Sequence, residues 1–152
     1  MRVHQIMIEP VVCCQSNEPL EAAARKLWDH DCGALPIVND QGVLVGMLTD
    51  RDICMAALHQ RSALSEISIP SAMSQVVYAV TRDASVAEVK ELMAAQQVRR
   101  VPVVDADNRP IGIVTMNDLI RAAARSGNGM TKAFQTLASI SQPRRRSVVK
   151  AA

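Results

Sequence analysis

Hydrophobic residues in the first half of the chain follow the periods of short strands and helices. Apolar side chains at the i, i+3, i+4, i+7 spacing predict one face of a helix: Leu20, Ala23, Ala24 and Leu27. Asn17 is suited to cap this helix, and Pro19 suits its first turn. The expected order of elements is β-α-β-β-α. A strand at 11–14 comes before the helix that begins at 20. Strands at 34–38 and 43–48 follow around a turn at 39–42, and a second helix runs from 49 to 58.

The second half repeats this pattern 66 residues later without insertion or deletion. The positions that carry the repeat are Pro36, Gly46, Thr49 and Asp52, which return as Pro102, Gly112, Thr115 and Asp118. Ser85 and Glu88 have the spacing of a capping box at the start of the repeated first helix. One register held over so many positions indicates two homologous folding units.

Each unit alone is too short to bury a large core. We therefore expect the two units to pack face to face and to share one hydrophobic core. Residues 127–129 are expected to end the last helix of the second unit. Beyond them, Phe134, Leu137 and Ile140 predict one short amphipathic helix over 131–140, packed on the body or on a second copy.

Charge and aromatic content argue against nucleic acid as the main partner. The 17 basic and 15 acidic residues leave a net charge of +2, too small to steer a polyanion. Trp28, Tyr78 and Phe134 are too few for a base-stacking platform. The basic tail from Arg144 to Lys150 is expected to be solvated, so contact with nucleic acid or a membrane surface is the minority interpretation.

Cysteine spacing and catalytic motifs exclude further classes. All four cysteines lie in the first half without a C-x-x-C motif, so neither zinc nor a disulfide framework is expected: Cys13, Cys14, Cys32 and Cys54. The adjacent pair is expected to be buried as small hydrophobes. We find no apolar run long enough for a signal peptide or a membrane span, and expect a cytoplasmic protein. No catalytic triad, H-E-x-x-H or Walker-type loop is present, so we expect no enzymatic activity.

Thr115 and Asp118 stand where a strand is expected to pass into a helix. The start of a helix offers unpaired N–H groups and a positive dipole end, which favour a phosphate. The Asp118 carboxylate can accept both hydroxyls of a ribose cis-diol, and Gly112 leaves room for a close backbone approach. Thr49 and Asp52 repeat the arrangement, and at both places an ordinary helix cap remains the alternative.

Two pairs of segments resemble the CBS (cystathionine β-synthase) domain motif. The first copy reads Gly-Ala-Leu-Pro-Ile-Val-Asn-Asp at 33–40 and Val-Gly-Met-Leu-Thr-Asp-Arg-Asp-Ile at 45–53. The second reads Arg-Arg-Val-Pro-Val-Val-Asp at 99–105 and Ile-Gly-Ile-Val-Thr-Met-Asn-Asp-Leu at 111–119. The segments 3–7 and 69–73 are similar to the lead-in of each motif, so the resemblance spans roughly residues 1 to 125.

The resemblance implies an α/β (α+β) fold. We expect two β-α-β-β-α CBS repeats, together a Bateman module, packed through their sheets with pseudo-two-fold symmetry, plus a short C-terminal helix. The expected division is 1–60 for CBS motif 1, 61–126 for CBS motif 2, and 127–152 for the C-terminal helix and basic tail.

Family members bind AMP, ADP, ATP or S-adenosylmethionine in clefts between the repeats and report occupancy to another protein. The resemblance therefore implies an adenine-nucleotide sensor that requires no cofactor, forms a homodimer, and regulates an unidentified partner protein in trans.

In the family, ribose and phosphate contacts come from one repeat and much of the adenine pocket from the other. For the cleft built on Thr115 and Asp118, the residues that the resemblance places near adenine are Cys32, Ala34 and the segment from Glu18 to Ala23. Pro36 is also expected among the ligand-binding residues. The mirror cleft would have Val98 and Arg100 beside the base, and this large cation should narrow it. We therefore expect the Asp118 cleft to be preferred.

Arg99 and Arg100 precede the second Pro-Val strand and should point to opposite faces of it. At least one is expected to neutralise a phosphate, which favours a phosphorylated adenine nucleotide over S-adenosylmethionine. The alternative is an edge-strand charge pair that discourages aggregation. A protein-interaction module with vestigial clefts, acting through its helices or residues 131–140, also remains open.

Overall fold

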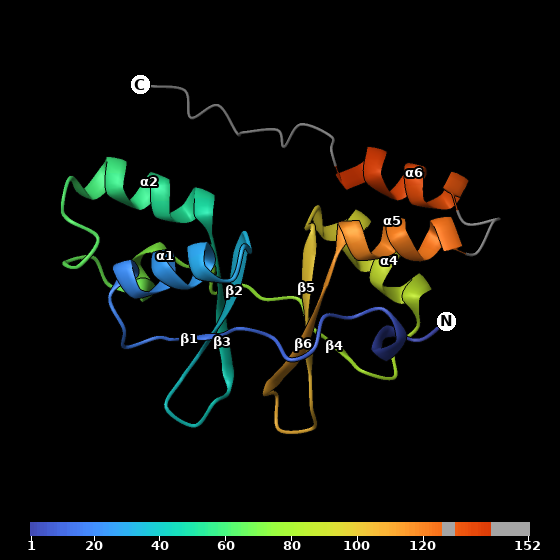
Figure 1. Cartoon of the computed structure of the whole chain (residues 1–152), viewed down its shortest axis with the longest axis horizontal. Helices are drawn as coiled ribbons and strands as arrows, with labels where there is room; N and C mark the ends of the chain where they lie inside the picture. The colour runs from blue at the N-terminus through green and yellow to red at the C-terminus, as the bar shows by residue number, and fades with distance from the viewer. Residues whose placement is uncertain (126–129, 141–152) are drawn as a thin grey trace, which may run out of the picture.

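The computed structural model of the chain describes residues 1–125 and 130–140, which form two similar units side by side (Figure 1). The first unit contains β1 (Cys14–Gln15), α1 (Leu20–Asp29), β2 (Ala34–Val38), β3 (Leu44–Thr49) and α2 (Asp50–Gln60). The second contains β4 (Val80–Thr81), α4 (Val86–Gln96), β5 (Arg100–Val104), β6 (Pro110–Thr115) and α5 (Met116–Arg125). Two short helical segments precede the units, η1 (Val3–Gln5) and α3 (Ile69–Ala72), and α6 (Met130–Ile140) follows them.

Each unit has one three-stranded sheet, ordered β1-β2-β3 in the first and β4-β5-β6 in the second. The short first strand runs parallel to the middle strand, which pairs antiparallel with the third. The expected α/β architecture of two β-α-β-β-α repeats is therefore confirmed. The first strand is shorter than expected and lies at Cys14–Gln15 instead of 11–14.

The two sheets face each other, and the helices lie on their outer sides (Figure 1). Every residue of β2 is buried, although successive side chains of a strand point to opposite faces. Leu35 and Ile37 belong to the core of their own unit, whereas Ala34 and Val38 are buried outside it. The second unit covers this other face, and the Leu44 N–H donates to the Asn108 carbonyl at 2.9 Å.

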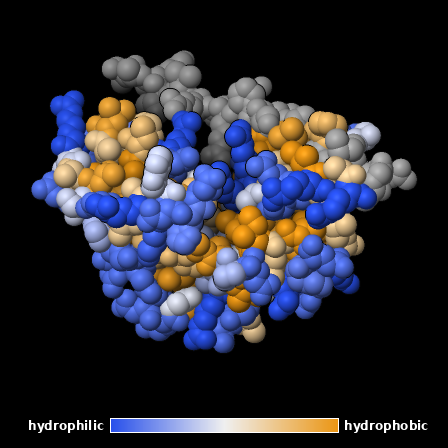
Figure 2. Space-filling view, in the orientation of Figure 1, coloured by the Kyte–Doolittle hydropathy of each residue, from blue (hydrophilic) through white to orange (hydrophobic). Residues whose placement is uncertain are grey.

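The structure has two hydrophobic cores, and the expectation of one shared core is wrong. One cluster fills the space between sheet and helices of the first unit, and the other does so in the second unit. The two sheets stand between the helix layers, so the apolar stripes of the helices cannot meet. Packing between the sheets joins the units without merging their cores. In the orientation of Figure 1, hydrophobic residues gather below the helices in the middle of the face, and hydrophilic residues surround them (Figure 2).

The lead-in segments are exchanged between the units. Val3 and Ile6 precede the first unit in sequence but lie in the core of the second. Ile67 and Ile69 precede the second unit but lie in the core of the first. Figure 1 accordingly shows the N-terminus beside the second unit. The lead-in segment of each repeat therefore completes the hydrophobic core of the other repeat.

Helix starts agree with the sequence at α4 and differ at α1. The expected capping box is present at α4, where Ser85 Oγ accepts from the Glu88 N–H at 3.1 Å. At α1 the cap position is Pro19, which makes no side-chain hydrogen bond. The Asn17 side chain instead donates to the Asp40 carboxylate at 3.1 Å, so Asn17 is not the cap. A contact with another loop has replaced the local bond that the sequence favoured.

Helix α6 packs against α4 and α5 of its own chain. Ile140 is buried in the second core and Leu137 packs against that core, whereas Phe134 is 58% exposed. Among the described residues, no helix combines the length and apolar character needed to cross a membrane. The tail from Arg144 to Lys150 lies outside the described residues.

Candidate functional site

Thr115 ends β6, and Asp118 stands in the first turn of α5. The Asp118 carboxylate folds back, and its Oδ2 accepts from the Thr115 N–H at 2.8 Å and from the Thr115 hydroxyl at 2.6 Å. Thr115 Oγ1 in turn accepts from the Asp118 N–H at 3.3 Å. Asp118 is only 3% exposed. The pair therefore closes the first turn of α5 and holds one carboxylate oxygen in a fixed place.

The junction between β3 and α2 has the same geometry. Asp52 Oδ2 accepts from the Thr49 N–H at 2.8 Å and from the Thr49 hydroxyl at 2.7 Å. Thr49 Oγ1 accepts from the Asp52 N–H at 3.2 Å. Both Thr-x-x-Asp sequences are thus helix caps in this structure. A cap of this kind still leaves the second oxygen of each carboxylate available for another donor.

One side chain distinguishes the two junctions. Arg121 donates to Asp118 Oδ1 from one turn along α5 and forms an ion pair with it. At the first junction Met55 stands three residues after Asp52, and Asp52 Oδ1 accepts no hydrogen bond from the described part of the chain. Arg121 is not among the site residues expected from the sequence. Its signal was the i, i+3 spacing of Asp118 and Arg121, which brings side chains together on a helix.

Arg100 extends from β5 of the second unit to the first unit. A Cβ atom added to Gly33 would lie 2.7 Å from Arg100 Nη2 and 3.4 Å from Asp50 Oδ2. Only glycine therefore leaves space for the guanidinium here without a shift. Because Asp50 begins α2, this contact places Arg100 beside the Thr49 junction. Arg99, the neighbouring residue, is exposed.

The ligand-binding residues expected from the first unit do not all face the space between the units. Ala34 and Pro36 are buried on β2, and Cys32 is half-buried just before it. Burial raises the pKa of the Cys32 thiol, although the charge of Arg100 acts in the opposite direction. Ala23 is fully buried in the first core, so its side chain is not open to a ligand.

Gly112 also has a different role from the expected one. A Cβ atom there would lie 2.8 Å from the Met7 sulfur and 3.1 Å from the Ile8 carbonyl oxygen. The Ile8 N–H donates to the Ile113 carbonyl at 2.9 Å, which holds the lead-in segment against β6. Gly112 therefore makes room for this segment and is covered by it.

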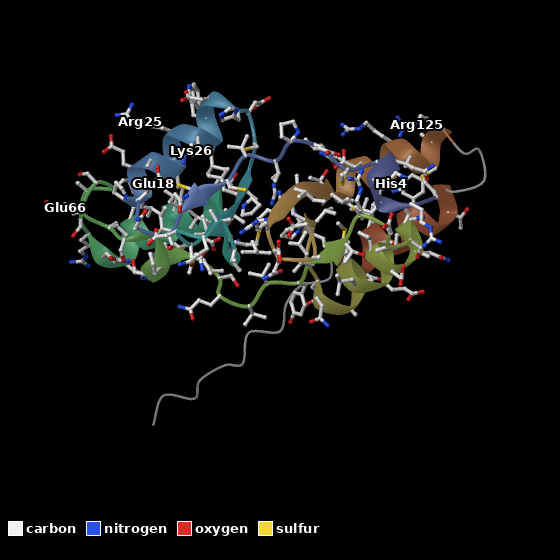
Figure 3. The ribbon with its side chains drawn as sticks, turned by 90° about the horizontal axis from the view of Figure 1, so that it is seen from below. His4, Glu18, Arg25, Lys26, Glu66 and Arg125 are labelled. Carbon is white, nitrogen blue, oxygen red and sulfur yellow. The ribbon has the colours of Figure 1, made fainter. Side chains whose placement is uncertain are left out.

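Glu18 lies in a small polar cluster on the first unit, where Figure 3 shows it near Lys26. Its carboxylate accepts from Lys26 Nζ at 2.9 Å, from the Gln15 N–H at 2.7 Å and from the Cys14 thiol at 3.0 Å. Burial alone would raise the pKa of Glu18, but these hydrogen bonds outweigh it and lower the pKa. Glu18 is thus fully engaged within its own unit.

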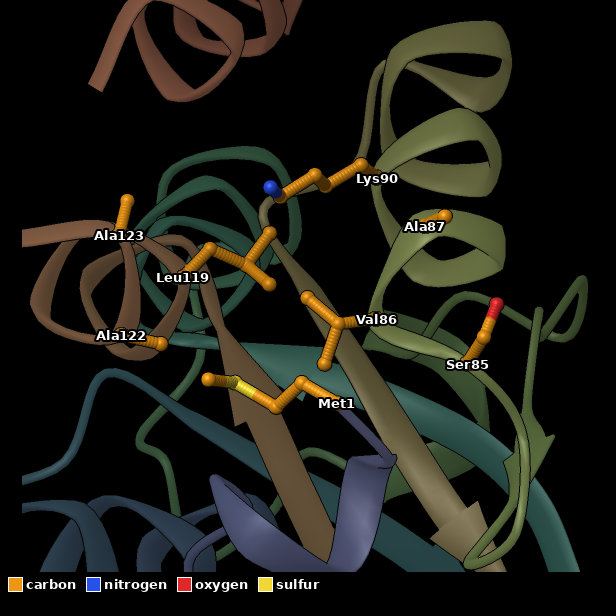
Figure 4. Close-up of a pocket in the computed structure, with 8 residues that line it drawn as sticks. All are labelled: Met1, Ser85, Val86, Ala87, Lys90, Leu119, Ala122 and Ala123. Carbon is orange, nitrogen blue, oxygen red and sulfur yellow. The ribbon is translucent and has the colours of Figure 1, made fainter. Parts of the chain in front are cut away.

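Two cavities lie on the helix sides of the units, and the second borders the Thr49 junction through Asp50 and Ile53. One of about 360 Å³ is lined by Met1 and by residues of the α4 and α5 segments, and Lys90 extends across it from α4 (Figure 4). The other, of about 330 Å³, is lined by α1, the residues that follow it, and the start of α2. Trp28 borders this second cavity and is 86% exposed. Neither cavity is the space between the two sheets.

Comparison with known proteins identifies the fold. The CBS domain family matches residues 3–59 and 64–125. Hypoxic response protein 1 of Mycobacterium tuberculosis is 40% identical over 116 residues, which cover 76% of this chain and 80% of that protein. A crystal structure of Hypoxic Response Protein I has two coordinated zinc ions and matches with 39% identity and a TM-score of 0.72, over 80% of this chain and 98% of that one. In residues 1–125 and 130–140, no three His, Cys, Asp or Glu side chains are placed to hold a metal ion.

Solved structures with bound adenosine compounds share the architecture. The CBS domain pair of protein MJ0100, in complex with 5′-methylthioadenosine and S-adenosyl-L-methionine, has 32% identity and a TM-score of 0.75, over 83% of this chain and 98% of that chain. CBSX2 in complex with AMP has the same fold at 23% identity, with a TM-score of 0.71 over 83% of this chain and 98% of its own. Family match, sequence identity and three-dimensional likeness agree, and the chain belongs to the CBS domain family, with two CBS domains in tandem.

Proposed function

We propose that this protein is a non-catalytic regulatory module that binds an adenine nucleotide of the AMP, ADP and ATP class. The observation that carries the proposal is the repeated Thr-x-x-Asp junction, where each carboxylate is held by its threonine at 2.8 Å or less. A fixed carboxylate at a helix start suits a ribose diol, and the helix dipole favours a nearby phosphate. The 5′-methylthioadenosine and S-adenosyl-L-methionine bound by the MJ0100 pair support a ligand that contains adenosine.

We place the preferred site at Asp118, with Cys32, Ala34 and Pro36 on the adenine side. Arg100 lies beside Gly33 at the opposite junction, where its side chain takes up space that a base would need. The small side chains at 32 and 34 leave more room at the Asp118 cleft. Of the two neighbouring arginines, Arg99 is the one left to supply positive charge for a phosphate at this site.

We further propose that nucleotide occupancy is reported to a separate protein in trans, in a cytoplasmic setting, through a homodimer. A ligand that bridges the units shifts their arrangement only as far as it binds one arrangement better than another. Exposed apolar residues on the helices offer a surface for protein contact, since Trp28 is 86% and Leu58 is 64% exposed. If the clefts bind nothing, this surface favours a protein-interaction module as the second candidate function.

Isothermal titration with AMP, ATP and S-adenosylmethionine tests the proposal on protein shown to be free of bound nucleotide. We expect saturable binding of AMP or ATP with about one site per chain. Tighter binding of S-adenosylmethionine than of either nucleotide would make the module a sensor of that compound. The absence of heat and of any thermal shift with all three ligands would refute the sensor and leave the interaction module.

Substitution of the two aspartates tests the choice of cleft. Asp118→Ala removes hydrogen bonds to an ionised group and should weaken nucleotide binding by about tenfold or more, whereas Asp52→Ala should have a smaller effect. Glu88→Ala is the matched control, since Glu88 holds the same position in the capping box of α4, away from both junctions. Equal losses of nucleotide affinity in the two aspartate variants would overturn the ranking of the clefts.

A further inference from the structure

The two Thr-x-x-Asp junctions have the same cap and differ at the third residue after the aspartate. Asp118 Oδ1 receives the Arg121 guanidinium, whereas Met55 at the equivalent position offers no donor to Asp52. Asp118 is 3% exposed, and Asp52 is only partly buried. An arginine thus covers the aspartate of the second junction, and no side chain at the equivalent position covers the aspartate of the first.

Arg121 stands in the way of a ribose at Asp118. Asp118 Oδ2 already accepts two hydrogen bonds from Thr115, so a hydroxyl of the sugar must bind at Oδ1. Arg121 binds that oxygen and Asp118 is only 3% exposed, so an incoming hydroxyl reaches it only when the guanidinium moves aside. The Arg121 side chain is 63% exposed, so it can move into solvent, whereas the buried Asp118 carboxylate then needs another donor, which a ribose hydroxyl can supply.

Displacement leaves an unpaired cation within one helical turn of the bound ribose. A ligand with a phosphate supplies a negative charge close to this cation and restores part of the lost attraction. A neutral nucleoside restores none of it, and a sulfonium ligand adds a repulsive charge. The net charge of the ligand therefore decides how much the displacement costs.

We propose that Arg121 is a specificity-determining residue, which makes the Asp118 cleft select anionic adenosine ligands over neutral or sulfonium ones. This inference rests on the proposed function and names the ligand class of the same site. It also predicts a difference between the two clefts: Met55 stands at this position in the first cleft, so no guanidinium has to leave Asp52 before a ribose binds.

Titration of wild type, Arg121→Met and Arg121→Lys with AMP, adenosine and S-adenosylmethionine tests the proposal. Arg121→Met copies the residue of the first junction, and Arg121→Lys keeps the charge. In wild type we expect AMP to bind more tightly than adenosine. In Arg121→Met, adenosine and S-adenosylmethionine should gain about fivefold in affinity, AMP should gain nothing, and the preference for AMP should fall accordingly. Arg121→Lys should retain most of the preference, and added salt should reduce it in wild type.

A reciprocal variant supplies the second test. Met55→Arg should cover Asp52 and raise the preference for AMP at any binding assigned to the first cleft. Equal changes in the affinity of AMP and adenosine in Arg121→Met would show that Arg121 only blocks the site, and would overturn selection by charge. If AMP binds the wild type and the ratio of AMP affinity to adenosine affinity is the same in every variant, this inference fails and the proposed function stands. If no adenosine compound binds wild type, the proposed function fails with it.

Discussion

At the scale of single residues, Cys14 illustrates how surroundings control chemistry. Its thiol is 1% exposed and donates to Glu18 Oε2 at 3.0 Å, with Lys26 Nζ 3.6 Å from the sulfur. Burial and the hydrogen bond to Glu18 raise the pKa of Cys14 to about 11, against the attraction of Lys26 for a thiolate. A thiol with this pKa is protonated at neutral pH, and the thiolate is the reactive form.

We predict that Cys54 reacts with iodoacetamide at pH 8 far faster than Cys14. Cys54 is exposed on α2, whereas a pKa near 11 leaves about one Cys14 in a thousand as thiolate at that pH. Mass mapping of alkylated peptides over time measures both rates, and the same labelling in urea confirms that each site is chemically competent. Similar rates for the two residues in the folded protein would contradict the assigned environment of Cys14.

The sequence predicts part of the site at this scale. Thr115 and Asp118 can be found because the repeat shows them twice in one register. The ion pair of Arg121 could have been found from helix spacing, but nothing local reveals that Arg100 reaches Gly33 in the other unit. The buried state expected for the adjacent cysteines holds for Cys14, whereas Cys13 is only partly buried.

At the scale of elements, α6 is an addition to the second unit that the first unit lacks. It lies across α4 and α5, and its buried end joins the second core. The sequence left open whether its apolar stripe packs on the body or on a second copy. Leu137 and Ile140 pack on the body, and Phe134 is largely exposed.

We predict that Ile140→Ala lowers the free energy of unfolding by about 2 kcal/mol, the low end for a buried isoleucine, because a terminal helix can relax around the gap. Phe134→Ala is the matched control. Because this side chain is 58% exposed, its removal should change the free energy of unfolding by less than about 0.5 kcal/mol. Urea unfolding followed by circular dichroism compares the two. A larger effect of Phe134→Ala would mean that this residue is buried in solution, as in an oligomer.

The type of a helix or strand could be predicted where its hydrophobic pattern is strong, but the residues at which it begins and ends could not. Two short apolar runs around turn-forming residues predict strands at 34–38 and 43–48, and the structure has them at Ala34–Val38 and Leu44–Thr49. The four-residue helix α3 was missed because so short a segment has no helical period of its own. Ile69 in this segment is fully buried in the first core, so tertiary packing stabilises it.

At the scale of the whole molecule, the exchanged lead-in segments tie the two CBS domains together. The sequence shows two repeats in tandem, and it is natural to expect each repeat to be a folding unit. The structure instead completes the first core with Ile67 and the second with Val3. This exchange could not be predicted from periodicity, because a repeat fixes the order of the elements and not which neighbour each connecting segment packs against.

The exchange predicts a crossed pattern of destabilisation in the full chain. Ile67→Ala leaves a cavity in the first core, although Ile67 belongs to the second repeat in sequence, and Val3→Ala leaves one in the second core. Local opening follows the core that is damaged. Amide hydrogen exchange should therefore show faster exchange in β2 and β3 for Ile67→Ala, and in β5 and β6 for Val3→Ala. Each variant is the control for the other, and faster exchange confined to the sheet of the same sequence repeat would show that the segments are not exchanged in solution.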